Sequence, residues 1–171
     1  LGVAPDEQSD DRLGLAGSSY QMQVSGVLAG RPPRMDFALE RGVQDVLRRA
    51  IAAGLLASAH DSSDGGLAIA LAESSIASGF GVALRLDVSS EGLTRALFAE
   101  GGARVAISVK AECRQQWDQL VAESTVPITE LGVVTDGEAF RIQGGERHLQ
   151  LSVTELKRAY QKGLPRRIGG E

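Results

Sequence analysis

The clearest pattern of hydrophobic positions in the chain runs from Asp36 to Ala53. Its apolar residues recur at intervals of three and four, which places them on one face of an α-helix. Asp36 can cap the start of this helix, and Gly54 stands where a helix commonly ends. The segment is therefore predicted to be an amphipathic helix, with an apolar stripe made of Leu39, Val43, Val46, Leu47, Ala50 and Ile51.

Three further elements are predicted directly after this helix. Residues 55–59 form a short apolar run that fits a buried strand. Residues 67–78 are apolar on most sides, with Glu73 as the only charge, and a helix of this kind is usually buried all round. In residues 82–86 the large apolar side chains alternate with small or charged ones, which predicts a half-buried strand.

The second half of the chain alternates helical and strand patterns. Asp136-Gly137 is typical of a hairpin turn and predicts that the strands on its two sides pair with each other. Ser152 and Glu155 have the spacing of a capping box, which predicts a final helix through Lys162. The other predicted elements are helices at 91–99 and 111–123, and strands at 104–109, 128–135, 139–143 and 147–151.

The order of these elements predicts the fold class. Helices and strands alternate early and strands gather late, which indicates an α/β (α+β) fold with a mixed, largely antiparallel sheet of four or more strands covered by helices. We expect the domain to span residues 13–163, with residues 1–12 as a linker or leader and residues 164–171 as a solvated tail. Because the chain begins with Leu1 and no signal segment follows, we expect an excised piece of a longer protein.

Composition and charge exclude several classes of function. The 18 Lys and Arg residues are outnumbered by 22 Asp and Glu residues, so the chain lacks the dense basic face that non-specific nucleic-acid binding requires. No uncharged apolar run approaches the roughly 18 residues of a membrane span. A lone Cys113 and two histidines predict neither a disulfide framework nor a metal site. Glycine is abundant, with 21 residues in 171.

The segment 59–68 concentrates groups that could carry chemistry. It lies where a predicted strand turns into a predicted helix, and the positive end of a helix dipole suits a phosphate or a carboxylate. An ordinary alternative is that the two aspartates cap the helix and the histidine packs in the core. The candidate residues, facing either a substrate phosphate or a neighbouring domain, are His60, Asp61, Ser63, Asp64, Gly65 and Gly66.

Two other loops contain secondary candidates. Gly17 and Ser18 precede a short helical stretch, and serine at this position also fits ordinary capping. Glu100 and Arg104 flank a Gly-Gly turn that leads into a strand, where the arginine could equally be solvated or salt-bridged. No order of Ser, His and Asp, phosphate-binding loop or pair of catalytic carboxylates stands out, so we assign no catalytic residue.

Taken together, the three loops resemble motifs of a known protein family. Residues 15–20, 59–68 and 97–104 resemble, in order and spacing, three motifs of the C-terminal domain of phosphoribosylformylglycinamidine synthase. The resemblance extends over residues 13–156. This sequence departs from the family's pattern at Ala16, where the family has glycine, at Ser19, where it has glutamate, and at Ser62, where it has valine.

The resemblance implies a fold like that of the aminoimidazole ribonucleotide (AIR) synthase C-terminal domain. It also implies a cytoplasmic enzyme that makes formylglycinamidine ribonucleotide from formylglycinamide ribonucleotide, ATP and glutamine. ATP and Mg²⁺ would be bound by the full-length enzyme and not tightly by this chain, which we expect to be inactive alone. The implied partners are the preceding domains and a glutaminase subunit that supplies ammonia, and a homodimer of this chain is a further expectation.

Two other functions are kept open. One is a domain of another ATP-dependent enzyme of the same superfamily, acting on aminoimidazole ribonucleotide, selenophosphate or thiamine phosphate. The motif at residues 59–68 disfavours this alternative, because related enzymes carry other versions of it. The other is a purely structural domain, in which the three loops only cap and pack. An adventitious sulfate at Gly65-Gly66 is the ligand we expect this chain to hold by itself.

Overall fold

The computed structural model describes residues 1–4 and 11–167 of the chain, and no side chain is described for residues 164–167. Its helices and strands follow the predicted order closely. In chain order they are α1 (Ser19–Ser25), α2 (Phe37–Ala52), β1 (Leu56–Asp61), α3 (Gly66–Ser78), β2 (Gly81–Leu86), α4 (Leu93–Phe98), β3 (Val105–Val109), a 3₁₀ turn η1 (Ala111–Cys113), α5 (Arg114–Ala122), β4 (Gly132–Thr135), β5 (Ala139–Gly144), β6 (Arg147–Ser152) and α6 (Val153–Arg167).

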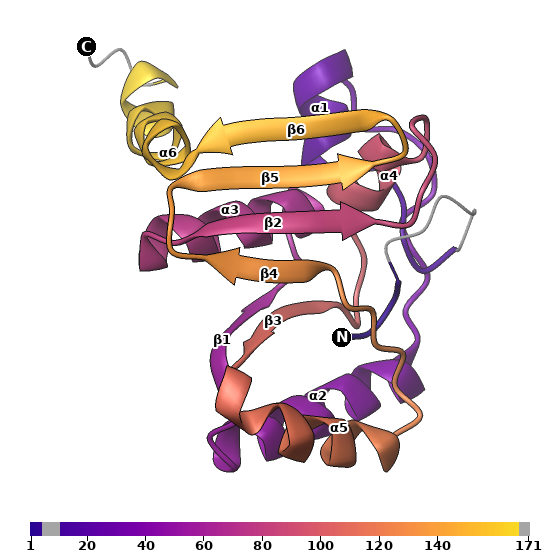
Figure 1. Cartoon of the computed structure of the whole chain (residues 1–171). Helices are drawn as coiled ribbons and strands as arrows, with labels where there is room; N and C mark the ends of the chain where they lie inside the picture. The colour runs from indigo at the N-terminus through magenta and orange to yellow at the C-terminus, as the bar shows by residue number, and fades with distance from the viewer. Residues whose placement is uncertain (5–10, 168–171) are drawn as a thin grey trace.

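A four-stranded mixed sheet forms the larger half of the domain, in the order β4-β2-β5-β6 (Figure 1). Strands β2 and β5 are parallel, and the other two pairs are antiparallel. The helices α3 and α4 lie behind this sheet in Figure 1, with α6 at one end. The predicted fold class, a largely antiparallel mixed sheet covered by helices, is confirmed.

The hairpin predicted at Asp136-Gly137 is wrong. Strand β2 lies between β4 and β5, so the two strands on either side of this turn do not pair with each other. The connection instead passes over the start of β2, where the Gly81 N–H donates to the Gly137 carbonyl at 2.7 Å. A Cβ on Gly81 would lie 2.4 Å from the carbonyl oxygens of Gly137 and Ala139. The glycine therefore lets the connection cross the start of β2, which lies inside the sheet between β4 and β5.

A first hydrophobic core fills the space between this sheet and its helices. Phe140 and Ile142 of β5 are each 1% exposed, and they pack with α3, α4 and β2. The predicted burial of α3 holds for its first half, with the exception of Ile69, which is 39% exposed. The buried residues of this core are Leu67, Ala68, Ala72, Val82, Leu86, Val88, Leu93, Ala96, Leu97, Phe140 and Ile142.

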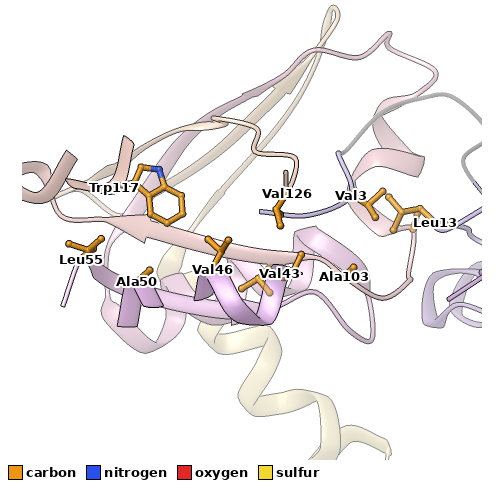
Figure 2. Packing of buried hydrophobic residues seen from close by; sticks show 11 residues of the cluster. Val3, Leu13, Val43, Val46, Ala50, Leu55, Ala103, Trp117 and Val126 are labelled. Atoms are coloured by element: carbon orange, nitrogen blue, oxygen red, sulfur yellow. The ribbon is translucent and has the colours of Figure 1, made fainter. Parts of the chain in front are cut away.

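A second core lies between α2, α5 and a separate two-stranded sheet, in which β1 and β3 are antiparallel. Val43, Val46 and Ala50, from the predicted stripe of α2, point into this core together with Trp117 of α5 (Figure 2). The strand predicted at residues 55–59 is present but not buried, because β1 pairs only with β3 and its middle residues are exposed. Only Leu55, just before the strand, is buried.

Residues 1–4, at the start of the expected leader, pack on this second core. Val3 is 5% exposed and lies beside Leu13 (Figure 2). The Val105 N–H donates to the Leu1 carbonyl, and the Val3 N–H donates to the Ala103 carbonyl. Leu1 and Val3 alternate with Gly2, so the two apolar side chains pack on the core while the backbone pairs beside β3. The acidic residues at positions 6, 7 and 10 lie outside the described residues.

The capping box predicted for the last helix is confirmed. The Ser152 hydroxyl accepts from the Glu155 N–H at 3.1 Å, and the Glu155 carboxylate accepts from the Ser152 N–H at 2.7 Å. Helix α6 continues past the predicted end at Lys162 to Arg167, so the first part of the expected tail is helical. Residues 168–171 lie outside the described residues.

Asp36 caps α2 as predicted, and its contribution to stability should depend on pH. Its carboxylate accepts from the Leu39 N–H at 3.1 Å, and this bond holds the pKa of Asp36 below its usual range. A lowered pKa in the folded state gives stability that is present above the unfolded pKa and lost as the pH falls through the folded one. Asn caps helices about as well without titrating. Asp36→Asn should therefore reduce the drop in thermal midpoint between about pH 7 and about pH 3.

Asp45→Asn is the matched control for this measurement, because Asp45 lies on the exposed side of the same helix. Its thermal midpoint should follow the wild-type dependence on pH. An equal acid-induced drop in wild type and Asp36→Asn would contradict the assignment of the cap.

Candidate functional site

The three loops singled out in the sequence meet at one point, the carboxylate of Glu100. Its Oε1 atom accepts from the Ser19 N–H at 2.8 Å and from the Gly65 N–H at 2.7 Å. The backbone of Glu100 also pairs with Gly14, through N–H···O bonds of 2.9 and 3.0 Å. A stacked pair of rings, Tyr20 on Phe98 at 4.9 Å between centroids, joins the first loop to the third. Segments 35 and 81 residues apart are thus held by one oxygen atom.

The two glycines of the central loop are required by its backbone. Gly65 and Gly66 have φ angles of +81° and +67°, a region that L side chains rarely adopt. A Cβ on Gly66 would lie 2.7 Å from the Ala99 carbonyl oxygen and 2.9 Å from that of Leu97. The end of α4 therefore packs directly on the first residue of α3, and only glycine leaves room for it.

Neither aspartate of the central loop caps α3. The N-cap residue is Gly65, which has no side chain to accept a hydrogen bond from the first turn of the helix. Glu100, which is distant in sequence, accepts from the Gly65 N–H instead. Asp61 and Asp64 remain exposed, as does Ser63, so these three side chains form the outer rim of the loop.

His60 lies at the edge of the site and not in the core. Its side chain is 30% exposed, with Nδ1 at 2.8 Å from the Asp61 carbonyl oxygen and Nε2 at 3.1 Å from a carboxylate oxygen of Glu73. Both ring nitrogens thus face acceptors. Glu73 is a contact that the sequence analysis did not assign. The sequence could have indicated it, because Glu73 is the only charged residue in an otherwise apolar helix.

Ser62 points inward, opposite to the rim. It is 5% exposed, and in the described part of the chain its Oγ has no hydrogen-bond partner. Its N–H donates to the Arg104 carbonyl at 2.9 Å. The valine that the family resemblance gives for this position would fill the same slot without burying a hydroxyl. Ser62 is therefore a packing position and not part of the exposed rim.

The secondary candidates divide into buried and exposed residues. Ser18 is 1% exposed and caps α1, with Oγ accepting from the Gln21 N–H at 3.1 Å. Arg104 is 5% exposed and donates to the Ala96 carbonyl at 2.8 Å, at the carboxyl end of α4. Of the two ordinary alternatives for Arg104, burial contradicts the solvated one, and its charge stabilises the negative end of that helix. Gly17 is exposed, beside the start of α1.

The geometry disfavours an anion at the start of α3. The Gly65 N–H donates to Glu100, the Gly66 N–H donates to the Ser63 carbonyl, and the Gly17 N–H donates to the Gln21 amide oxygen. The N–H groups of the two glycines beside which a sulfate was expected are thus already bonded within the chain. The exposed rim of carboxylates and a hydroxyl suits sugar hydroxyls or N–H donors and repels phosphate.

Among residues 1–4 and 11–167, no three His, Cys, Asp or Glu side chains come close enough together to hold a metal ion. A cleft of about 690 Å³ lies between β3 and β4 and is lined mainly by apolar side chains. None of Asp61, Ser63 and Asp64 lines it. No helix in the described segments is both long and apolar enough to span a bilayer.

Comparison with known proteins agrees with this architecture. Residues 2–145 match the model of the AIR synthase related protein, C-terminal domain family. The chain belongs to this family. The family resemblance inferred from the three loops is thereby confirmed, and the AIR synthase related C-terminal domain accounts for most of the described fold.

Among the curated relatives of this C-terminal domain is phosphoribosylformylglycinamidine synthase subunit PurL of Parasynechococcus marenigrum, strain WH8102. It is 80% identical over 171 residues, which are 100% of this chain and 22% of the relative. The chain thus spans about a fifth of the length of that relative.

Solved structures support the same fold. Thermotoga maritima PurL complexed with FGAR has a TM-score of 0.66 at 12% identity, covering 91% of this chain and 26% of that one. PurL of the same organism complexed with ATP has a TM-score of 0.59 at 16% identity, covering 85% of this chain and 24% of that one. At these identities the likeness concerns the fold.

Proposed function

We propose that this chain forms the C-terminal domain of phosphoribosylformylglycinamidine synthase. The full-length enzyme would convert formylglycinamide ribonucleotide, ATP and glutamine to formylglycinamidine ribonucleotide in purine biosynthesis, in the cytoplasm. The observation that carries this proposal is the 80% identity to a PurL subunit over the whole chain. It also counts against the alternative enzymes of the superfamily, those acting on aminoimidazole ribonucleotide, selenophosphate or thiamine phosphate.

In this proposal the chain supplies a wall of the active-site cleft and no catalytic residue. ATP and Mg²⁺ are bound by the preceding domains, and Mg²⁺ neutralises the transferring phosphate there. The loop N–H groups of Gly65 and Gly17, which are already bonded within the chain, support this division. The relative of known structure complexed with ATP is a much longer chain than this one. This chain alone would be inactive.

The exposed rim of Asp61, Ser63 and Asp64 is the part of the domain that we assign to the cleft. Exposed carboxylates can accept hydrogen bonds from ribose hydroxyls or from N–H groups of the neighbouring domain. A contact with a substrate phosphate, the other expectation for this loop, is disfavoured by the negative charge of the rim.

The surface beside Gly17 supports the proposed partners. Helix α1 and the segment after it expose large apolar side chains, which in monomeric proteins rarely gather in one place. In the full-length enzyme the preceding domains would cover this surface, and the glutaminase subunit would bind elsewhere on the assembly. In the isolated chain a second copy would cover it and give a homodimer. The exposed apolar residues are Met22, Val24, Val27, Leu28, Met35 and Phe37.

Substitution of Asp61 in the full-length enzyme tests the assignment of the rim. Its side chain is 76% exposed and makes no hydrogen bond to the core, so Asp61→Ala should leave stability unchanged. Loss of a hydrogen bond to a charged acceptor should raise KM for formylglycinamide ribonucleotide about tenfold. The measurement is ADP release at varied ribonucleotide concentration, with Asp45→Ala on the exposed side of α2 as the matched control.

Two outcomes would count against these assignments separately. Absence of ADP release that depends on the ribonucleotide, in the wild-type full-length enzyme, would contradict the proposed function. Wild-type kinetics for Asp61→Ala would leave the function in place and favour the structural alternative, in which the loop only caps and packs.

A further inference from the structure

The Glu100 carboxylate occupies the place that helix α3 offers to an anion. A helix of 13 residues carries a partial positive charge at its start, and its first N–H groups favour negative ligands. Here the Gly65 N–H, at the N-cap of α3, donates to Glu100 Oε1 at 2.7 Å. A carboxylate of this domain therefore already lies at the N-cap of α3, where the helix dipole favours a negative charge.

The same oxygen also orders the entrance to α1. It accepts from the Ser19 N–H at 2.8 Å, so both bonds are short and charge-assisted, the stronger class of hydrogen bond. Glu100 itself is fixed from behind by the paired backbone of Gly14 and by the packing of α4 against Gly66. A rigid carboxylate between two loops sets the distance between them.

We propose that Glu100 is a positioning residue, which sets the central loop of residues 61–66 against the first loop of residues 17–20. This inference rests on the proposed function, because the position of the rim matters for substrate binding in the synthase. Glu100 does not contact the substrate. It acts through the Gly65 N–H, which fixes the turn that carries Ser63 and Asp64.

The proposal has a consequence for recognition. A substrate phosphate that binds the Gly65 N–H must displace Glu100 from it. The Glu100 carboxylate therefore disfavours a phosphate beside Gly65 and favours an uncharged or cationic part of a ligand there.

The test uses two variants of Glu100 in the full-length enzyme. Glu100→Ala removes the acceptor, whereas Glu100→Gln keeps an oxygen at the same reach and removes only the charge. We expect Glu100→Ala to raise KM for formylglycinamide ribonucleotide about tenfold with kcat within about threefold, and Glu100→Gln to restore KM to within about threefold of wild type. Glu146→Ala, in the exposed turn between β5 and β6, is the control and should keep wild-type kinetics.

Hydrogen exchange measured on the same proteins gives a readout that does not depend on activity. In Glu100→Ala the amides of residues 17–22 and 62–68 should exchange faster, because Ser19 and Gly65 lose their acceptor. The amides of β5 and β6, residues 139–152, should exchange as in wild type.

The outcomes distinguish this inference from the proposed function. Unchanged exchange in both loops of Glu100→Ala, or faster exchange that includes residues 139–152, would overturn the positioning role. Equal KM values for Glu100→Ala and wild type would overturn it as well. If the wild-type enzyme shows no synthase activity but the two loops alone exchange faster, the structural part of the inference stands and the proposed function fails.

Discussion

Phe140→Ala should lower the free energy of unfolding by about 3–5 kcal/mol, the range for removing a large aromatic side chain from a packed core. Phe140 is 1% exposed and lies on β5, between Val82 of β2 and Leu151 of β6. It is among the largest fully buried side chains of the described residues. Its ring packs in the core that joins the sheet to α3 and α4, so the cavity left by alanine cannot close without moving both helices.

Tyr160→Ala is the matched control, because Tyr160 is 65% exposed on α6. Equilibrium unfolding in urea, followed by circular dichroism, measures both variants against wild type. We expect a change below about 0.5 kcal/mol for the exposed position. A similarly small change for Phe140→Ala would mean that the Phe140 side chain does not stabilise the packing of the sheet on α3 and α4.

Local signals in the sequence predict elements well, and the order of strands in the sheet poorly. The spacing of apolar residues predicts α2 and its cap at Asp36, because both depend on residues within a few positions of each other. The pairing of β4 with β2 depends on residues about 50 positions apart, so the turn signal at Asp136-Gly137 pointed to the wrong neighbour. The informative residue was Gly81, whose missing side chain makes room for the crossing connection.

The candidate site was likewise predictable only where it depends on residues that are close in sequence. Clustered Asp, Ser and Gly residues identified the loop at 60–66, because this chemistry is concentrated over a few positions. The sequence could not show that Glu100 accepts from Gly65, since that contact depends on how α4 packs on α3. It also could not tell which members of the motif are exposed. Ser62 and Asp61 are neighbours in sequence, yet one is buried and the other forms the rim.

Gly66→Ala should be the most damaging single-methyl change in the site. At a φ of +67° an alanine costs about 1–2 kcal/mol by itself. The added Cβ would also lie 2.7 Å from the Ala99 carbonyl oxygen, which is backbone and cannot turn away as a side chain would. The end of α4 must move, and Glu100 with it, so we expect a total loss of about 3 kcal/mol or more in the free energy of unfolding.

Gly54→Ala separates the two causes of this loss. Gly54 has a φ of +69°, nearly the same as Gly66, but no atom outside its neighbours lies within 4 Å of the position of its Cβ. Its substitution should cost only the conformational part, about 1–2 kcal/mol, when both variants are unfolded in urea under the same conditions. Because the two positions share a conformation and differ in crowding, the difference between the variants measures the contact of α4 with α3. Equal losses would show that this contact does not hold the three loops together.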